Sequence, residues 1–538
     1  MKIIVTESIA KEGIQSLIDI GFEVDVRFGI DREELLSVID QYDAIIVRSV
    51  TKINEELLER APKLKVVGRA GNGVDNISLS ACTQRGIIVV NTPESNIMAA
   101  AELAIAHAFN AFRNLTKAVI AGKNHDFRRG NFIGNELDDK TVGIIGLGRI
   151  GSIVAKKLKG CNMHVIAYDP YITEERFKNC GVRKCETLDD LLREADLITI
   201  HTPKTPETIG IIGAEEIAKC KDGVRIVNAA RGGLVDEKAL YDGLVSGKVA
   251  FAGLDVLDPE PNYNKKPEEQ DYTNPLLELD NISITPHLGA STTEANYNVG
   301  TAVTKLVGQA LNGEMVPAVN MPPVKAGNME EIKPYLDLAE MMGKIYYQVE
   351  KDVVKSIEIT YSGDLAEKDT DIITLSAMKG FLQPIVDSRV NYVNARMILE
   401  SMGVRLEEKK TTKLEKYTNL ISIRFINDKK SLGVSGTVFA KSEIRIVDFF
   451  GYKMDFEPTS NVIAIHNEDV PGMIGKIGTV LGANGINITA MQWSSNKAAG
   501  RAESFVSVDK PVAKEILKQI AELEGVLKVS PISFLKLF

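Results

Sequence analysis

Residues 1–92 alternate short β-branched apolar runs with stretches whose apolar positions recur at helical spacing. Buried parallel strands have continuous apolar runs, and helices make the crossovers between them. The pattern therefore predicts an open α/β sheet. Its expected strands are residues 3–5, 24–28, 44–47, 65–67 and 87–90, with helices at 31–40 and 54–61.

A second α/β series begins at Thr141, after a long helical pattern at residues 97–115. The polar, proline-bearing stretch 260–274 predicts a long loop, and loops of this length are often functional. We expect two doubly wound, Rossmann-like domains that form a cleft. The second series has expected strands at 142–145, 164–168, 197–200, 224–228, 250–254 and 282–285, and helices at 150–158, 237–245 and 292–311.

The α/β alternation ends at the linker 316–324, and an α+β domain is expected beyond it. Its predicted elements are helices 335–349 and 391–402 and strands 421–425 and 443–449. From Val462 the order is strand, helix, strand, strand, helix, strand, which is the βαββαβ order of a ferredoxin-like unit. The expected domains are 1–96 with 286–320, then 97–285, 321–456 and 457–538.

Composition supports a multidomain globular protein. At ~150 residues per domain, a chain of 538 residues exceeds one core. The apolar share of 44% and the charged share of 25% are ordinary. The net charge of −9 comes without a basic stripe, so we expect neither nucleic acid nor a membrane as a partner.

The five cysteines form no CxxC pair, which favours a reducing compartment over a disulfide framework or a zinc site. We expect no bound metal. No apolar run reaches the ~18 residues of a membrane span, and the N-terminus does not resemble a signal peptide. A cytoplasmic location is the expectation.

A glycine-rich turn between a strand and a helix predicts a dinucleotide site. Gly146 permits the turn, Gly148 lets the backbone approach a pyrophosphate, and Gly151 allows the helix to pack closely. Asp169, after the next strand, would bind the ribose and favour NAD over NADP. The alternative is a glycine turn that binds nothing. Further predicted cofactor contacts lie in this turn or at strand ends: Arg149, Ile150, Thr202, Ala229, Ala230, Arg231 and Asp255.

Three further segments, NAARG at 228–232, DVLDPEP at 255–261 and PHLGAST at 286–292, resemble the signatures of the D-2-hydroxyacid dehydrogenase family. The resemblance covers residues 1 to about 320. It implies NAD as cofactor, with His287 as acid and base, Glu260 as its partner and Arg231 as the carboxylate anchor. It also implies contacts between the coenzyme and His287, Leu288, Gly289 and Ala290.

The chemistry suits these residue types. An imidazole exchanges protons near neutral pH, a carboxylate can orient it, and a guanidinium can hold a substrate carboxylate through two hydrogen bonds. The simpler alternatives are that His287 is a solvated or capping residue and that Glu260 belongs to a solvated acidic edge. His107, in an apolar helix, is expected to be a packed residue.

Arg48 and Arg69 stand at strand ends of the first sheet, and Gly71 and Gly73 could form a backbone nest for a carboxylate. A substrate with a carboxylate and a phosphate would fit. These segments resemble those of D-3-phosphoglycerate dehydrogenases, which implies oxidation of 3-phospho-D-glycerate to 3-phosphohydroxypyruvate. By the same resemblance, Asn72, Gly73 and Asn96 contact substrate or nicotinamide.

Two alternatives remain for the function: another dehydrogenase of the family, such as a hydroxypyruvate or glyoxylate reductase, and a nucleotide-sensing regulator without turnover. Arg128 and Arg129 either complete an anion site, including one on another subunit, or are surface charges.

The C-terminal part resembles regulatory modules. Residues 465–473 and 485–488 are similar to an ACT domain, which implies that Asn467, Asp469 and Asn487 bind L-serine as an effector. Residues 324–456 resemble the intervening domain of the long-form enzymes, where Lys441 and Arg445 are weak candidates for an anion site. A homo-oligomer, most simply a tetramer, is expected. The alternative is an ACT domain used only for assembly.

Overall fold

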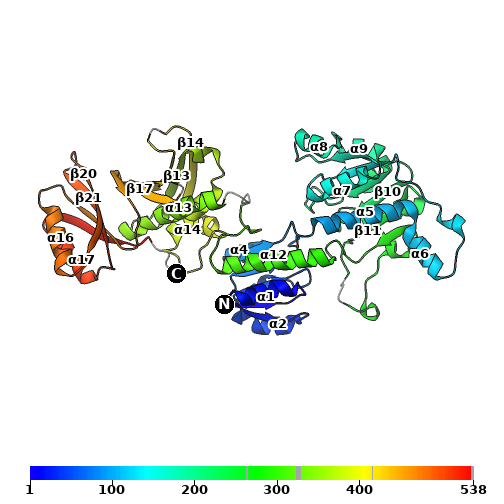
Figure 1. Ribbon diagram of the computed structural model, residues 1–538, viewed down its shortest axis with the longest axis horizontal. Helices are drawn as coiled ribbons and strands as arrows, with labels where there is room; N and C mark the ends of the chain where they lie inside the picture. Colours follow the sequence, from blue (N-terminus) through cyan, green and yellow to red (C-terminus); the bar gives the residue numbers. More distant parts are fainter. Residues whose placement is uncertain (262–264, 323–328, 415, 441, 535–538) are drawn as a thin grey trace.

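The computed structural model describes residues 1–261, 265–322, 329–414, 416–440 and 442–534. Within these residues the chain forms four sheets, arranged along an elongated molecule (Figure 1). The five-stranded N-terminal sheet lies in the middle, the seven-stranded sheet lies at one end, and the two C-terminal sheets lie toward the other end. The parallel, mixed and antiparallel sheets confirm the predicted fold class.

The five-stranded sheet is parallel, in the order β2-β1-β3-β4-β5. Apolar cores cover both of its faces: α1 and α12 pack on one, and α2, α3 and α4 on the other. The sequence pattern did not predict α1 and α4, although each buries two residues, as the predicted helices α2 and α3 do. The elements are β1 (Lys2–Val5), α1 (Lys11–Asp19), β2 (Glu23–Val26), α2 (Arg32–Val38), β3 (Ala44–Val47), α3 (Glu55–Glu59), β4 (Val66–Arg69), α4 (Leu79–Gln84), β5 (Ile88–Asn91) and α12 (Thr293–Leu311).

The seven-stranded sheet is also parallel, in the order β12-β11-β10-β9-β6-β7-β8. The strand order reverses between β6 and β9, and ligands of open α/β sheets bind at the carboxyl side of such a reversal. The elements are β6 (Thr141–Ile145), α7 (Arg149–Lys159), β7 (His164–Tyr168), α8 (Glu174–Cys180), β8 (Arg183–Lys184), α9 (Leu188–Glu194), β9 (Leu197–Ile200), α10 (Ala214–Lys219), β10 (Val224–Asn228), α11 (Glu237–Ser246), β11 (Val249–Leu254) and β12 (Ile282–Ile284).

The helix predicted at residues 97–115 is two helices. α5 (Ile97–Arg113) packs on β10 and β11, and α6 (Leu115–Lys123) follows at once. Asn114 between them has a φ of 51°, a left-handed conformation that asparagine tolerates better than most residues. The single helical pattern therefore hides a break at this residue.

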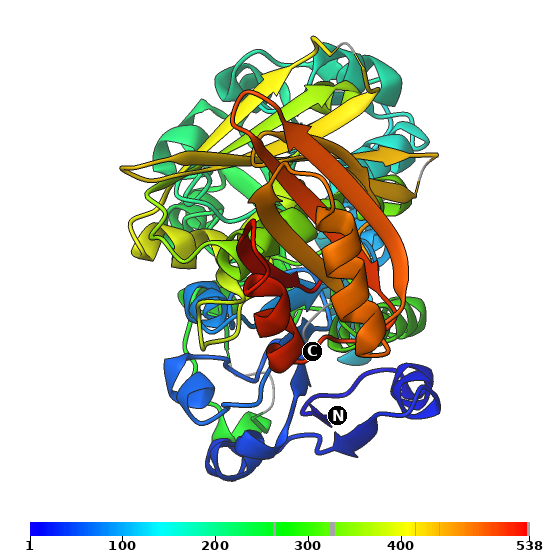
Figure 2. The same cartoon turned by 90° about the vertical axis from the view of Figure 1, so that its left-hand side faces the viewer.

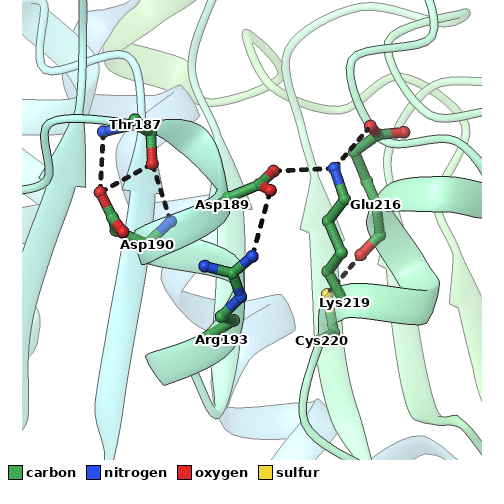
Figure 3. A network of polar contacts seen from close by, with 7 residues as sticks. All are labelled: Thr187, Asp189, Asp190, Arg193, Glu216, Lys219 and Cys220. Carbon is green, nitrogen blue, oxygen red and sulfur yellow. Dashed lines mark hydrogen bonds and ion pairs between the residues drawn. The ribbon is translucent and has the colours of Figure 1, made fainter.

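A polar network ties α9 to α10 (Figure 3). Lys219 of α10 places its Nζ 2.8 Å from an Asp189 oxygen, and Arg193 lies 3.4 Å from the other oxygen. Thr187 and Asp190 form a capping box at the start of α9. Because the ion pairs are partly exposed, solvent screens them and each adds little to stability, and the network is structural.

The six-stranded sheet has β13 parallel to β14 and antiparallel pairing elsewhere, in the order β14-β13-β15-β16-β17-β18. The helix predicted at residues 335–349 begins earlier in the structure. α13 starts at Met329 and contains Pro334. The predicted helix 391–402 begins later, because the Asn394 side chain accepts from the Asn391 N–H in a turn. The elements are α13 (Met329–Val349), β13 (Ser356–Gly363), α14 (Asp371–Leu382), α15 (Ala395–Ser401), β14 (Arg405–Thr411), β15 (Asn419–Ile426), β16 (Ser431–Phe439), β17 (Glu443–Phe449) and β18 (Tyr452–Phe456).

The last sheet is antiparallel, in the order β20-β21-β19-β22, which confirms the ferredoxin-like prediction. Helices α16 and α17 cover one of its faces (Figure 2). Its other face contributes Ala464 and Phe505 to the core of the six-stranded sheet, so these two units share a core. The elements are β19 (Val462–Glu468), α16 (Met473–Ala483), β20 (Ile488–Asn496), β21 (Arg501–Val508), α17 (Lys514–Ala521) and β22 (Val526–Ile532).

Two side chains fasten this C-terminal part to the N-terminal sheet. The Arg389 Nη1 donates to the Leu64 carbonyl at 2.5 Å, and the Asn391 Nδ2 donates to the Gly86 carbonyl at 2.7 Å. Burial lowers the pKa of Arg389. The C-terminal part is thus joined to the sheet that carries Arg48 and Arg69.

Candidate active site

The three glycines of the dinucleotide turn differ in their surroundings. Gly146 has a φ of 90°, and a Cβ there would lie 2.7 Å from the His201 carbonyl oxygen. A Cβ on Gly151 would lie 2.1 Å from the Gly146 carbonyl oxygen, so helix α7 packs closely on the turn. Gly148 faces open space and precedes the first turn of α7, which holds Arg149 and Ile150. An anion can therefore approach the turn at Gly148.

Asp169 and Thr202 border this turn. One Asp169 oxygen accepts from the Leu147 N–H at 3.0 Å, which fixes the carboxylate beside the turn. The Thr202 hydroxyl is buried and has no hydrogen-bond partner among the described residues. An unpaired buried hydroxyl is costly unless a ligand completes it. Both observations fit a dinucleotide, and Ala229 and Ala230 follow β10 at the same edge.

His287 occupies a strained turn after β12. Its φ is 54°, and its Nδ1 lies 3.0 Å from the Glu260 Oε1. The side chains are 35% and 37% exposed, so both are partly accessible from solvent. The structure therefore brings together the predicted histidine and carboxylate, which the sequence separates by a strand and a long loop.

Asp255 builds the turn that carries His287. Its buried carboxylate accepts from the Leu288 and Gly289 N–H groups at 2.7 and 2.8 Å and from the Thr285 hydroxyl at 2.6 Å. Ala290 is the next residue of this turn. Asp255 thus has a clear structural role, and its direct contact with the coenzyme stays a prediction.

His107 is more than the packed residue that the sequence predicted. Its Nε2 lies 3.0 Å from the Thr285 hydroxyl and its Nδ1 lies 3.1 Å from the Ser283 hydroxyl. Burial lowers the pKa of His107, which favours the neutral ring. Helix α5 therefore supports the Asp255 turn through a hydrogen-bonded imidazole. In the sequence, the sign of this supporting role was a histidine within an apolar helix.

The loop that carries Glu260 is held by residues that the sequence did not single out. Asp258 pairs with Lys204 at 2.7 Å, and its N–H donates to Glu237 at 2.6 Å. The other Glu237 oxygen accepts from Asn274 at 2.6 Å, farther along the same loop. These contacts position the described parts of the loop on either side of residues 262–264, which lie outside the described residues.

Arg48, Arg69 and Arg231 converge. The pKa of Arg69 is lowered to about 10, mainly by burial and also by the positive charges of Arg48 and Arg231. The Arg69 Nε is buried without a hydrogen-bond partner among the described residues. The five-stranded sheet supplies two of these guanidiniums and the seven-stranded sheet supplies the third, so positive charges from both sheets act on one another here.

The neighbouring glycines fit closely against this cluster. A Cβ on Gly73 would lie 2.6 Å from an Arg231 Nη, and one on Gly71 would lie 2.0 Å from an Arg69 Nη. The Asn72 carbonyl accepts from the Asn91 side chain at 2.7 Å, which fixes the same segment. Asn96 occupies the N-cap position of α5 without a side-chain hydrogen bond to the helix. Gly71 and Gly73 therefore border the arginines, and the position of Asn96 in the site stays a prediction.

The three predicted effector residues do not all lie in one hollow. Asp469 lines a hollow of about 400 Å³ together with residues 470–474 and Trp493. Asn467 is buried, and its Oδ1 has no partner among the described residues. Asn487 is exposed and does not line the hollow. A single chain therefore does not bring the three residues together.

The predicted anion site in the intervening part is not supported. Arg445 lies 3.5 Å from each of the carboxylates of Glu443, Asp455 and Glu457, so its charge is already compensated. Lys441 lies outside the described residues.

Arg128 and Arg129 follow α6 in the chain, and α6 itself lies at the end of the molecule away from the five-stranded sheet (Figure 1). The Arg128 side chain donates two hydrogen bonds to Asp126, and its backbone N–H donates a third. They do not join the arginine cluster of their own chain. A role in the site of another subunit stays a prediction.

The described residues contain no group of three His, Cys, Asp or Glu side chains placed to hold a metal ion. Every helix in this part of the chain falls short of the length and apolarity of a bilayer-spanning segment.

Three family models match the chain. They are the NAD-binding domain of D-isomer specific 2-hydroxyacid dehydrogenases at residues 105–289, the intervening domain of D-3-phosphoglycerate dehydrogenase at 331–450, and the ACT domain at 461–525.

Solved structures agree with the first match. A D-lactate dehydrogenase from Aquifex aeolicus, complexed with NAD and lactic acid, is 30% identical with a TM-score of 0.51 and covers 58% of this chain and 96% of its own. A glyoxylate reductase from Paecilomyes thermophila is 29% identical with a TM-score of 0.53 and covers 59% and 98%. Fold and site define an NAD-binding oxidoreductase of the D-isomer specific 2-hydroxyacid dehydrogenase class.

Whole-chain relatives narrow this class. The D-3-phosphoglycerate dehydrogenase of Archaeoglobus fulgidus is 42% identical over 98% of this chain and 99% of its own. That of Methanocaldococcus jannaschii is 41% identical over 99% and 100%. This chain belongs to the D-3-phosphoglycerate dehydrogenase family.

Proposed function

We propose that the chain oxidises 3-phospho-D-glycerate to 3-phosphohydroxypyruvate with NAD, the first step of L-serine biosynthesis. The convergence of Arg48, Arg69 and Arg231 carries this proposal, because a substrate with both a phosphate and a carboxylate supplies two anions to such a cluster. The names of the whole-chain relatives support it.

The site residues have separate roles in this proposal. Arg231 holds the substrate carboxylate and polarises the forming carbonyl group. His287 takes the hydroxyl proton in oxidation and returns it in reduction. Because Glu260 engages Nδ1, the proton is exchanged at Nε2, and the carboxylate stabilises the imidazolium that forms. Arg48 and Arg69 bind the phosphate, while Asn72, Gly73 and Asn96 border the substrate.

The second sheet provides the coenzyme contacts in this proposal. Bound NAD supplies the hydride acceptor. Gly148 and the α7 N-terminus would hold the pyrophosphate, and Asp169 would hold the ribose. The other residues that would hold the coenzyme are Gly146, Arg149, Ile150, Gly151, Thr202, Ala229, Ala230, Asp255, Leu288, Gly289 and Ala290.

An assay of NADH absorbance tests the substrate. We expect 3-phosphohydroxypyruvate to be reduced with a far higher kcat/KM than hydroxypyruvate or glyoxylate. Arg48→Ala should raise KM about 10- to 100-fold for the phosphorylated substrate alone, because one charge-assisted contact is lost. Arg60→Ala, at the end of α3, is the matched control. Preference for glyoxylate or hydroxypyruvate would favour the reductase alternative, and NAD binding without any turnover would favour the regulator.

We also propose L-serine as the effector of the ACT domain, with Asp469 binding its ammonium group. The hollow beside Asp469 and the unpaired Asn467 oxygen support this. Since Asn487 stands apart, a complete site requires a second ACT domain. Serine bound there would disfavour closure of the cleft, and allostery of this kind requires different affinities for the two states.

Self-association is part of the proposal. α5, α6 and the segment after them expose a group of large apolar side chains, and such a patch favours contact with another protein surface. We propose a homo-oligomer, most simply a tetramer, located in the cytoplasm. An Ile120→Asp variant should sediment as a smaller species. The exposed apolar residues are Phe109, Leu115, Val119, Ile120, Phe127 and Ile133.

We also propose four domains with the bounds 1–96 with 286–320, 97–285, 321–456 and 457–538. In this division the chain passes between the first two domains near Asn96 and near Pro286. The packing of α5 on the seven-stranded sheet and of α12 on the five-stranded sheet supports it.

A further inference from the structure

Glu7 fills a ring of backbone donors in the loop that carries Arg48. Its Oε1 accepts from the N–H groups of Arg48 at 3.0 Å and Thr51 at 2.9 Å. Its Oε2 accepts from those of Ser49 and Val50, both at 3.1 Å. Successive N–H groups in a turn form a nest for an anion. Here the chain's own carboxylate occupies the nest.

The carbonyl groups of the same loop are held from the other side. The Asn76 Nδ2 donates to the Arg48 carbonyl at 3.0 Å and to the Thr51 carbonyl at 2.7 Å. The Thr51 hydroxyl lies 2.9 Å from the Thr6 hydroxyl, at the end of β1. The loop after β3 is therefore fastened both to the neighbouring strand and to the segment that follows β4.

The negative charge of Glu7 also acts on the arginine cluster. It raises the pKa of Arg69, whereas the charges of Arg48 and Arg231 lower it. Glu7 thus lies close enough to compensate part of the repulsion among the guanidiniums. At the same time, its oxygens accept four hydrogen bonds from the backbone of the loop.

We propose that Glu7 is a positioning residue for recognition of the substrate phosphate. It fixes the loop so that the Arg48 guanidinium meets the phosphate, and it keeps the backbone nest from binding that phosphate itself. This inference depends on the proposed function, which assigns the phosphate to Arg48 and Arg69.

Glu7→Gln tests this role because the amide has almost the same shape but only one acceptor oxygen. Its NH₂ group would face N–H donors of the loop, so part of the ring of hydrogen bonds is lost. We expect the KM for 3-phosphohydroxypyruvate to rise about 10- to 100-fold with kcat within about 2-fold, the loss expected for hydrogen bonds to a charged group. The KM for hydroxypyruvate should not change. Glu12→Gln removes a carboxylate from the first turn of α1 and is the matched control.

A double variant separates positioning from direct binding. If Glu7 acts through Arg48, Glu7→Gln with Arg48→Ala should be no worse than Arg48→Ala alone. Asn76→Ala removes the hydrogen bonds to the carbonyl groups of the loop and should cause the same selective rise in the KM for 3-phosphohydroxypyruvate. This variant replaces Glu7→Gln in the test if Glu7→Gln does not fold.

Two results would overturn the role of Glu7. They are an unchanged KM in both loop variants and full additivity of Glu7→Gln with Arg48→Ala. A normal KM in Arg48→Ala would instead overturn the proposed phosphate site. The two failures are therefore distinguishable.

Discussion

The Nδ1 of His287 lies 3.0 Å from the Oε1 of Glu260, although β12 and the long loop separate the two residues in the chain. Neighbouring residues fix the segments that carry both side chains. Asp255 accepts from the turn after His287, and Lys204 pairs with Asp258 beside Glu260. The pair is thus set on supported loops at the carboxyl edge of one sheet, as an acid–base pair requires.

Glu260→Gln should keep the orientation of His287 but remove the charge that stabilises the imidazolium. We expect kcat to fall about 10- to 100-fold while NAD binding, followed by coenzyme fluorescence, stays normal. The matched control is Asp139→Asn, because Asp139 lies 2.8 Å from His164 in a similar but exposed pair. Equal turnover of Glu260→Gln and the control would contradict the proposed role.

The sequence predicted those parts of the site in which residue type and local position are sufficient. The glycine turn, His287 and Arg231 stand at strand ends or in short motifs, and the structure places them at the predicted edges. Glu7 and Lys204 could not be recognised, and His107 was predicted only as a packed residue, because each acts through a partner that only the tertiary fold brings near.

The fold shows the same division. α14 was missed because ten of its twelve residues are buried, so it has no polar face and no helical period. The break at Asn114 was missed because α6 continues the helical pattern in a new direction. Sheet order was open as well, since the sequence indicates strands but not which strands are neighbours.

Gly148 and Gly151 should separate coenzyme binding from folding. Gly148→Ala adds a methyl group to open space beside the turn, so we expect near-normal stability and at least about 10-fold weaker NAD binding. Gly151→Ala places its methyl group 2.1 Å from the Gly146 carbonyl oxygen and should lower stability by about 1–3 kcal/mol. Thermal unfolding and NAD titration measure the two effects. Identical behaviour of the two variants would contradict this division.

Glu503 should make the ACT domain less stable as the pH rises. Burial raises its pKa from 4.5 to about 7, and the Lys528 charge only partly opposes this. His466, which lies 2.9 Å from it, has a pKa lowered by burial and by the charges of Arg501 and Lys528, so it offers little positive charge. Between pH 4.5 and about 7 the unfolded state loses this proton first, and the stability falls with each increment of pH.

Glu503→Gln removes this titration. Relative to the natural chain, we expect little change below pH 4.5 and a gain of roughly 2–3 kcal/mol above pH 7. Urea unfolding followed by the fluorescence of Trp493, the one tryptophan of the sequence, reports on this domain. Glu522→Gln, on the exposed end of α17, is the control. Parallel pH curves for all three proteins would show that Glu503 does not carry the effect.

Trp493 also provides a direct measure of effector binding, because it lines the same hollow as Asp469. L-serine should change its fluorescence over the concentration range in which it inhibits turnover. Asp469→Ala should abolish both responses and leave basal kcat and KM normal, since the hollow lies in the ACT domain, at the end of the elongated molecule opposite to the seven-stranded sheet (Figure 1). Glu515→Gln on α17, which does not line the hollow, should retain both the fluorescence change and the inhibition.

Serine inhibition that survives in Asp469→Ala would place the effector elsewhere. A fluorescence change without inhibition would instead leave the ACT domain with a binding or assembly role, because regulation requires that the bound effector favour one state of the cleft over the other.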